Sequence, residues 1–215
     1  MSLFITFEGI EGCGKTTQME LLKKALEEEG VSVTITREPG GTKTGNRLRP
    51  ILLGKKGNEL FPLTELLLYL ACRAQLIEEV IRPALDEGKV VLCDRFADST
   101  RVYQGSGRGL DIEIIDRFNE IAAGGIRPDI TFIIDCPVEK GLKRAWARIA
   151  SAKGDAAQES RFEKAEISFH RKVREGYLAL AATEERFKVI DGDRDKFLIH
   201  DEIYGIVNSC IEGVT

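Results

Sequence analysis

Short, strongly apolar segments alternate along this chain with longer segments in which apolar residues recur every three or four positions. Five of the short segments read as strands: residues 3–7, 31–36, 90–93, 130–134 and 187–190. Strands that are apolar on both faces and separated by helices indicate a parallel sheet with helices on both sides. The pattern therefore predicts an α/β fold built on a parallel five-stranded sheet.

Glycines mark the ends of the two longest predicted helices. A helical pattern over about 15–29 is followed by Gly30, and a second pattern over 63–86 is followed by Gly88. Glycine is common just past the end of a helix because it adopts the left-handed conformation without steric cost. Between 151 and 160 the residues are small and polar, which indicates a loop.

Composition narrows the class of protein. The 215 residues, of which 43% are hydrophobic, suit a single core, so we expect one domain over 1–215. The net charge of −4 argues against a general surface for nucleic acid or for an anionic membrane. Five scattered cysteines without a CxxC pair indicate reduced thiols, and no apolar run approaches the ~20 residues that span a bilayer. We expect a cytoplasmic enzyme with no nucleic-acid or membrane partner.

The clearest motif lies between the first predicted strand and the first predicted helix. Residues 9–16 match GxxxxGK[ST], a loop whose main-chain N–H groups bind phosphates at a helix N-terminus. In this motif Lys15 reaches the β- and γ-phosphates, and the Thr16 hydroxyl binds Mg²⁺. The residues expected to hold ATP are Gly9, Ile10, Glu11, Gly12, Cys13, Gly14, Lys15, Thr16 and Thr17. The signatures of GTPases and transport ATPases (DxxG, NKxD, LSGGQ) are absent, which favours a small-molecule kinase.

Two acidic residues follow buried strands and are candidates for the metal. Asp94 comes directly after the strand at 90–93, and Asp135 after the strand at 130–134. Ligands of open α/β sheets bind beyond the carboxyl ends of strands. We take Thr16 and Asp94 as the first metal candidates, but the sequence leaves the choice between Asp94 and Asp135 open. Arg95 comes directly after Asp94, at the place where a phosphate would bind. The alternative is that Asp94 and Arg95 are a structural pair at the end of a strand.

Aromatic and basic residues point to an acceptor site. Tyr69 and Arg73 are four residues apart on the predicted helix and share a face, which suits a planar base. Taken alone, core packing with the charged end of the arginine reaching solvent is the better interpretation of the pair. Arg37 follows the second strand, in a segment that also reads as an ordinary turn.

Basic residues also crowd the later half of the chain. Arg144 and Arg148 lie in one short helical stretch, and Arg161 follows the polar loop. A solvated basic helix face is the simpler interpretation. In a kinase, an arginine in a lid at about 148–161 could instead close over the transferring phosphoryl group and stabilise its developing charge.

Taken together, the segments resemble the bacterial thymidylate kinases. The family's order is kept from about Phe4 to Asp193 by FEGIEGCGKTT, TREPGGT, LLLYLACRAQ, DRFADSTRVYQGSGRG, FIIDCPVEKGLKRA and VIDGD. The resemblance implies a three-layer P-loop kinase fold with helices on both faces of the sheet and a lid segment. It also implies transfer of the γ-phosphoryl group of ATP to dTMP, giving dTDP and ADP in dTTP biosynthesis.

The resemblance also implies roles at the acceptor site. Arg95 and Arg37 would grip the 5′-phosphate of dTMP, and Glu11 would face the 3′-hydroxyl. Tyr69 takes the place of the ring that stacks on thymine, where Phe is usual, and Arg73 that of the arginine bonded to O4. The remaining residues implied around the base and sugar are Ser99, Thr100, Gln104 and Tyr103, the last crowding C2′ against a ribonucleotide.

The same resemblance bears on catalysis and assembly. Lys15, Arg95 and Glu11 would be catalytic, and Arg144 would lie over the adenine of ATP. Family members with glycine at the position of Gly12 carry a catalytic arginine in the lid. Here the candidates are Arg161 and Arg148, in a lid that is longer and richer in alanine than is usual. The family usually forms homodimers.

Two rival functions differ in what the site must do. A kinase of thymidine would need a carboxylate base, Glu11 or Asp94, to take a hydroxyl proton. In that case Arg95 and Arg37 would have no acceptor phosphate to hold. A nucleotide-binding module without catalysis is the other rival, although the presence of the P-loop lysine and the Asp94–Arg95 pair argues against it.

Overall fold

The computed structural model describes residues 2–54, 60–151 and 160–213. Its strands are β1 (Leu3–Glu8), β2 (Val33–Arg37), β3 (Val90–Asp94), β4 (Ile130–Asp135) and β5 (Phe187–Asp191). Its helices are α1 (Lys15–Glu28), α2 (Lys43–Leu53), α3 (Pro62–Leu76), α4 (Arg82–Asp86), α5 (Ala97–Thr100), α6 (Ile112–Ala123), α7 (Val138–Ser151), α8 (Ile167–Ala181) and α9 (Lys196–Glu212). All five predicted strands are confirmed, with small shifts at their ends.

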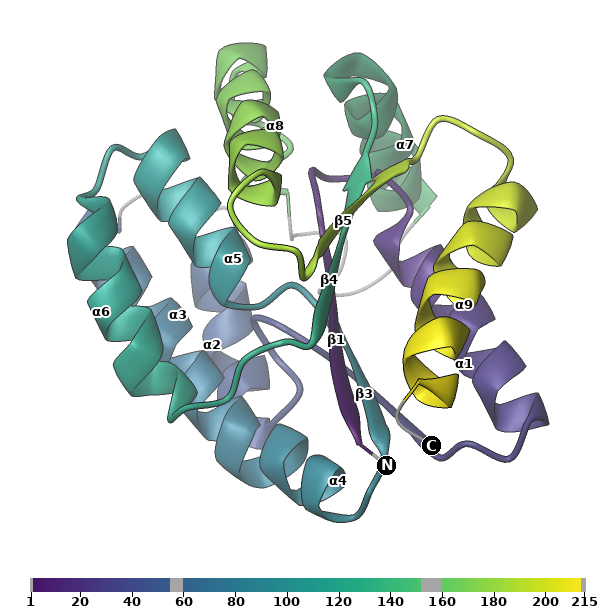
Figure 1. The fold of residues 1–215 in the computed structure, drawn as a ribbon. Helices are drawn as coiled ribbons and strands as arrows, with labels where there is room; N and C mark the ends of the chain where they lie inside the picture. Colours follow the sequence, from purple (N-terminus) through teal and green to yellow (C-terminus); the bar gives the residue numbers. More distant parts are fainter. Residues whose placement is uncertain (1, 55–59, 152–159, 214–215) are drawn as a thin grey trace.

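The five strands form one parallel sheet in the order β2-β3-β1-β4-β5. In the centre of the sheet, Ile5 of β1 lies opposite Leu92 of β3 and Ile130 of β4. Helices cover both sides: α1 and α9 lie on one side, and α3, α4 and α6 on the other (Figure 1). The predicted α/β class and three-layer arrangement are therefore confirmed.

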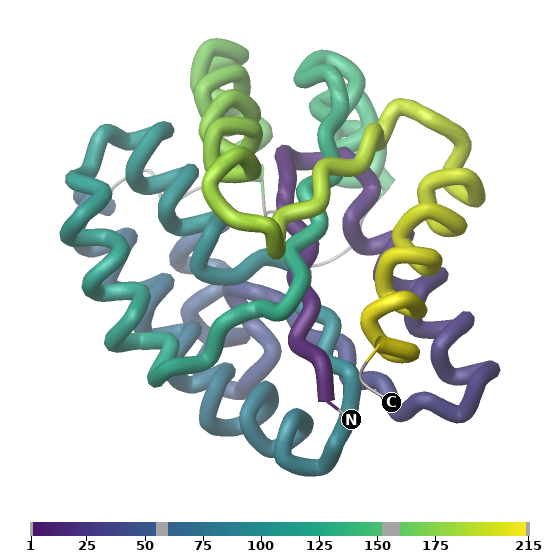
Figure 2. The backbone as a smooth tube through the Cα atoms, viewed as in Figure 1, coloured from purple at the N-terminus to yellow at the C-terminus, as the bar shows by residue number. Residues whose placement is uncertain are grey.

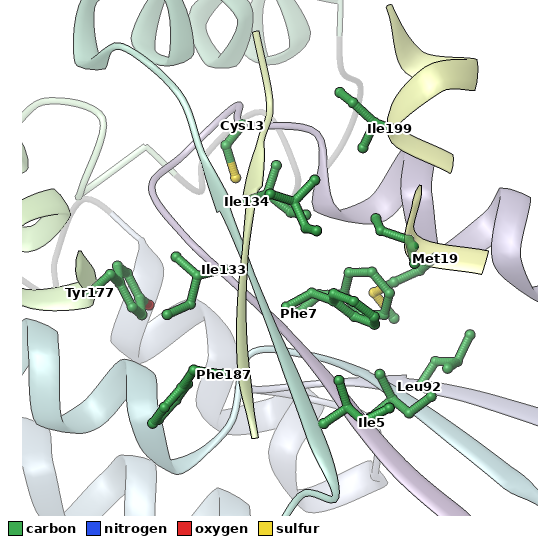
Figure 3. Packing of buried hydrophobic residues seen from close by; sticks show 14 of the residues in the cluster. Ile5, Phe7, Cys13, Met19, Leu92, Ile133, Ile134, Tyr177, Phe187 and Ile199 are labelled. Atoms are coloured by element: carbon green, nitrogen blue, oxygen red, sulfur yellow. The ribbon is translucent and has the colours of Figure 1, made fainter. Parts of the chain in front are cut away.

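The core follows from the alternation of side chains along the strands. Figure 3 shows Phe7 and Met19 on the side of α1 and α9, whereas Ile133 and Tyr177 lie on the opposite side of the strands. Phe4, next to Leu3 in β1, packs into a separate cluster with the helical segment that follows α3. Buried apolar surface on both faces holds the central strands rigidly, so the loops at their carboxyl ends have a fixed base.

Two helical segments differ from the prediction. The helix predicted over 63–86 is one continuous helical run, but it begins at Pro62 and passes through a π-helical segment, Ile77–Ile81, between α3 and α4. Helix α2 was not predicted because Gly45 and Pro50 lie within it. Thr42 caps this helix by accepting a hydrogen bond from the N–H of Gly45 at 2.9 Å. Most of the predicted lid loop, 152–159, lies outside the described residues.

Candidate active site

The glycine loop lies between β1 and α1, where Figure 2 shows the chain passing close to α7. Gly9 has φ +130°, and a Cβ there would come within 2.5 Å of the carbonyl oxygen of Ile134. Gly12 has φ +71°, and its Cβ would come within 2.0 Å of the carbonyl oxygen of Gly141 on α7. No side chain fits at either position. An arginine at position 12 is therefore excluded by packing.

Lys15 begins α1 and is buried against the loop that precedes it. Its Nζ donates to the carbonyl oxygens of Ile10 at 2.9 Å and Gly9 at 3.2 Å. The neighbouring Thr16 donates its hydroxyl hydrogen to Oδ2 of Asp94 at 3.1 Å. The loop thus presents an ammonium group, a helix N-terminus and a hydroxyl–carboxylate pair at one end of the sheet.

The two candidate metal carboxylates occupy different surroundings. Asp94 contacts Thr16 of the loop. Asp135 instead accepts two hydrogen bonds from Arg174, at 2.6 and 2.7 Å, and does not line the cavity into which Thr16 and Asp94 open. Within 2–54, 60–151 and 160–213, no group of three metal-ligating side chains occurs. A hard cation at this site would be held by few protein oxygens together with nucleotide phosphates.

A cavity of about 1030 Å³ opens above the carboxyl ends of the strands. Gly9 and Ile10, the first two residues of the loop, are not among the residues that line this cavity. The predicted site residues that line it are Glu11, Gly12, Cys13, Gly14, Lys15, Thr16, Thr17, Arg37, Tyr69, Arg73, Asp94, Arg95, Ser99, Thr100, Tyr103, Gln104, Arg144, Arg148 and Arg161. The phosphate loop and the predicted acceptor residues therefore share one space.

Arg95 follows β3 in an unusual backbone conformation, with φ 71°. Its N–H donates to the carbonyl oxygen of Phe7 at 3.0 Å, which ties the end of β3 to β1. The guanidinium donates to Ser99 Oγ at 3.2 Å, to Tyr177 OH at 3.0 Å and to Glu11 Oε1 at 3.1 Å. Such a held guanidinium fork suits a phosphate in the cavity.

Behind Arg95 lies Glu8, a fully buried carboxylate that sequence reasoning missed because it ends an apolar strand. Its oxygens accept hydrogen bonds from Phe96 N at 2.8 Å, Ser99 Oγ at 2.6 Å and Tyr177 OH at 2.8 Å. Burial and nearby Asp98 raise the pKa of Glu8 to about 7, although Arg95 and the two hydroxyls act in the opposite direction. Glu8 thereby orients the groups that hold Arg95.

The raised pKa of Glu8 makes stability depend on pH. Because the folded chain holds this proton more tightly than the unfolded chain, the stabilisation is complete below the unfolded pKa of 4.5 and is lost as pH rises through about 7. We expect about 3 kcal/mol of unfolding free energy to be lost across this window in the unmodified chain, and not in Glu8→Gln. Urea unfolding at about pH 5 and about pH 8 measures the difference, with Glu20→Gln on the exposed face of α1 as control. Equal pH dependence in all three proteins would contradict the prediction.

Arg73 is buried on α3 and is almost fully occupied by protein groups. It donates to Glu38 Oε2 at 2.7 Å and to Thr100 Oγ1 at 2.9 Å, and another hydrogen bond joins it to Asn119. Glu38 and Asn119 were missed by sequence reasoning, since nothing local marks them as partners. Tyr69, one turn earlier, lines the cavity, and burial raises the pKa of its hydroxyl. The structure therefore places Tyr69 and Arg73 at the cavity wall, where the hydrogen bonds to Glu38, Thr100 and Asn119 fix the Arg73 side chain.

Arg73→Ala should destabilise the fold strongly. Removing one partner of a buried ion pair leaves the carboxylate of Glu38 without its counter-charge, at a cost of about 3–5 kcal/mol. Arg82→Ala breaks an exposed pair with Glu78 and should cost less than about 1 kcal/mol. Denaturant unfolding of both variants provides the comparison. The double variant Arg73→Met/Glu38→Gln should recover part of the loss, and similar values for Arg73→Ala and Arg82→Ala would contradict the argument.

The two candidate lid arginines face different parts of the cavity. Arg161 is buried, donates to the carbonyl oxygen of Leu52 at 3.0 Å and forms an ion pair with Glu65 of α3. Gln104 also donates to Glu65, at 2.6 Å, so this missed carboxylate joins two predicted site residues. Arg148 is on α7, the helix packed on Gly12, and its side chain is largely exposed, 3.4 Å from Glu163.

Arg144 lies on the same helix as Arg148. It donates to the carbonyl oxygen of Gly192 at 3.3 Å, at the loop after β5, and approaches Asp193 at 3.8 Å. This position is on the phosphate-loop side of the cavity, because α7 packs against Gly12. The two α7 arginines therefore flank the nucleotide-donor half, and Arg161 the acceptor half.

Glu11 is the acidic residue of the glycine loop, and its carboxylate contacts side chains from three other parts of the chain. Its Oε1 accepts hydrogen bonds from Arg95 at 3.1 Å and from the hydroxyl of Tyr103. Its Oε2 lies 3.2 Å from Nδ1 of His170, which sequence reasoning also missed. Burial raises the pKa of Glu11, but His170, Arg95 and Tyr103 together lower it to about 2. The carboxylate is ionised at neutral pH.

A phosphate loop between a parallel sheet and a helix, with arginines converging on one cavity, defines a P-loop kinase. The thymidylate kinase family model matches residues 7–203. Thymidylate kinases of Citrifermentans bemidjiense and Geobacter sulfurreducens are each 57% identical to this chain, over 91% and 90% of it and 86% and 90% of their own lengths. A crystal structure of the Ehrlichia chaffeensis thymidylate kinase superposes with a TM-score of 0.75 at 35% identity, covering 96% of this chain and 98% of that one. The chain belongs to the thymidylate kinase family and is a phosphotransferase, as the motifs indicated.

No helix in the described ranges has both the length and the apolar character needed to cross a bilayer.

Proposed function

We propose that this chain transfers the γ-phosphoryl group of ATP to dTMP, giving dTDP and ADP in the synthesis of dTTP. The observation that carries the proposal is the shared cavity: the glycine loop with Lys15 and the held guanidinium of Arg95 open into the same space. A loop for a nucleotide triphosphate and an arginine for a second phosphate are what a nucleoside monophosphate kinase requires. Membership in the thymidylate kinase family supports the choice of acceptor.

On the donor side, the loop N–H groups and Lys15 would bind the phosphates of ATP, with Arg144 near the adenine. Mg²⁺ fits the adjacent oxygens of Thr16 and Asp94, because hydroxyl and carboxylate oxygens are its usual ligands. When bound there, the ion would neutralise charge on the phosphate oxygens. The contact between Thr16 and Asp94 favours Asp94 over Asp135, whose two oxygens are engaged by Arg174.

On the acceptor side, the 5′-phosphate of dTMP is itself the nucleophile. Since it is already ionised at neutral pH, the reaction needs no general base, and catalysis rests on in-line positioning and charge neutralisation. Arg95 and Arg37 would hold this phosphate, Glu11 would face the 3′-hydroxyl, and Tyr103 would crowd C2′. The residues proposed around the base are Tyr69, Arg73, Ser99, Thr100 and Gln104.

We assign the lid arginine of the donor side to Arg148, within a lid at about 148–161. Arg161 is engaged by Glu65 and by the carbonyl oxygen of Leu52, so its charge is directed to the acceptor half of the cavity. Arg148 is on α7 beside Gly12, with an exposed side chain that can turn toward the phosphates.

An assay of ADP release with Mg·ATP tests the reaction against its rivals. The acceptors to compare are dTMP, dUMP, dCMP, dGMP, AMP, UMP and thymidine. Strong preference for dTMP is the expected result. Preference for thymidine would identify a nucleoside kinase and remove the proposed roles of Arg95 and Arg37. Binding of ATP without turnover of any acceptor would identify a nucleotide-binding module.

We also propose a cytoplasmic homodimer. The five cysteines are all unpaired, which fits a reducing compartment.

An apolar surface over α3 and α6 supports the homodimer. Phe61 and Leu63 at the start of α3, and Ile121 on α6, expose large apolar side chains, and α3 and α6 pack side by side. A second copy of the chain is the occupant we expect for this surface. Size-exclusion chromatography with light scattering should give a dimer, and Leu67→Glu in the same surface should give a monomer; an unmodified monomer would contradict the assembly alone.

A further inference from the structure

His170, on α8, is fully buried between the glycine loop and the residues that follow the lid loop. Its Nε2 lies 2.9 Å from the carbonyl oxygen of Phe162. Its Nδ1 lies 3.2 Å from Oε2 of Glu11. Both atoms are buried, and among the described residues neither meets hydrogen-bond geometry with any partner, so what joins them is this 3.2 Å ion-pair contact. The imidazole ring therefore bridges two oxygen atoms from distant parts of the chain.

The chemistry of these two oxygens fixes the protons on the ring. A carbonyl oxygen only accepts hydrogen bonds, so Nε2 must carry a hydrogen to satisfy Phe162. A neutral imidazole has a single N–H, and its Nδ1 would then point a lone pair at the carboxylate of Glu11. Two buried acceptors in contact would both be unsatisfied, at a cost of about 1–3 kcal/mol for each group.

The missing proton could in principle lie on Glu11, but the other contacts of that carboxylate oppose this. Oε1 of Glu11 accepts from the Arg95 guanidinium and from the Tyr103 hydroxyl, and both donors stabilise the ionised form. The proton shared across this contact therefore belongs to the imidazole.

Other charges near the ring are consistent with a cation there. The Glu163 carboxyl, beside the lid loop, has a pKa raised first by burial and then by nearby Glu11, and Arg148 lies 3.4 Å from it. Glu11 and Glu163 thus place negative charge close together in a buried region. Arg95, packed over the Tyr103 ring, and Arg148 supply two positive charges against them, and a protonated His170 supplies a third.

We propose that His170 carries hydrogens on both ring nitrogens and is a positioning residue that ties the lid end at Phe162 to the loop carboxylate Glu11. This positioning role rests on the proposed function, because His170 acts on the acceptor only through Glu11 and Arg95. By holding Oε2, His170 leaves Oε1 aimed at Arg95. By holding the carbonyl of Phe162, it keeps that ring edge-on against Tyr103, with centroids 5.2 Å apart.

The charge state can be measured without substrate, because the chain has two histidines, His170 and His200. Nitrogen NMR of histidine-labelled, ligand-free protein near neutral pH distinguishes a protonated ring nitrogen from a bare one, and His200→Asn assigns the signals. We expect two protonated nitrogens on His170. In Glu11→Gln, which removes the carboxylate charge, one of them should become bare. A bare nitrogen in the unmodified protein, or no change in Glu11→Gln, would overturn the inference.

Kinetics of two substitutions test the positioning role. His170→Phe keeps an aromatic ring but removes both N–H groups, and it should raise KM for dTMP roughly ten- to a hundredfold while KM for ATP changes little. His170→Gln keeps two amide hydrogens and should recover part of this loss. Equal rises of both KM values, or no recovery with Gln, would indicate a merely structural residue and contradict the proposal.

The two levels of inference fail separately. If the unmodified chain has no dTMP kinase activity, the proposed function fails whatever the NMR signals show. If the chain is active but His170 has a bare nitrogen, the inference about His170 fails and the proposed function stands.

Discussion

Lys15→Ala is expected to abolish phosphoryl transfer while the chain remains folded. Lys15 is the single ammonium group of the glycine loop, and with ATP bound it would leave the carbonyl oxygens of Gly9 and Ile10 for the β- and γ-phosphates. Its charge offsets the charge that develops on the transferring group in a water-poor site. Loss of one such electrostatic contact typically lowers kcat by about 10²–10³-fold, and we expect at least the upper figure here.

The fold should survive this change because the loop is held by other contacts. Gly9 packs against β4 and Gly12 against α7, and neither contact involves the lysine side chain. Circular dichroism and denaturant unfolding should confirm a folded variant. Lys24→Ala, at an exposed position of the same helix, is the matched control and should keep full activity. A folded Lys15→Ala with normal turnover would refute the role assigned to Lys15.

The sequence predicted those parts of the site whose chemistry is local. The glycine loop is one unbroken motif between a strand and a helix, and Asp94 and Arg95 follow a buried strand directly, so position along the chain was enough. The strands were predicted for a similar reason, because central parallel strands are apolar at nearly every position. Local motifs of this kind carry their own structural context.

The residues that orient the site escaped prediction because their partners are remote in sequence. Glu8 and Tyr177 are hydrogen-bonded although 169 residues apart, and Arg73 and Glu38 are 35 apart. A buried carboxylate has no periodic pattern of its own; only the fold shows which donor it meets. The same holds for Glu65, which determines where Arg161 points. Sequence could propose a lid arginine but not decide between two.

Arg95→Ala is expected to lower kcat/KM for dTMP by about 10³-fold, the second large effect. Arg95 would meet the acceptor phosphate, and its guanidinium also offsets the charge of Glu11 at 3.1 Å. Without it, the carboxylate of Glu11 would repel the incoming phosphate. Arg95→Lys should recover little, since one ammonium group cannot reproduce the planar fork that reaches Ser99, Tyr177 and Glu11 together.

The backbone conformation of Arg95 allows a test that distinguishes loss of its side chain from disturbance of the fold. With φ at 71°, Arg95 is held where an L residue is strained, whereas glycine adopts this conformation freely. Arg95→Gly should therefore be at least as stable as Arg95→Ala in denaturant unfolding, yet equally impaired with dTMP. Arg101→Ala, which removes a half-exposed pair with Asp116, is the control and should leave kcat/KM unchanged. If Arg95→Gly regained activity relative to Arg95→Ala, the loss would come from the backbone, and the guanidinium would not be the group that holds the acceptor phosphate.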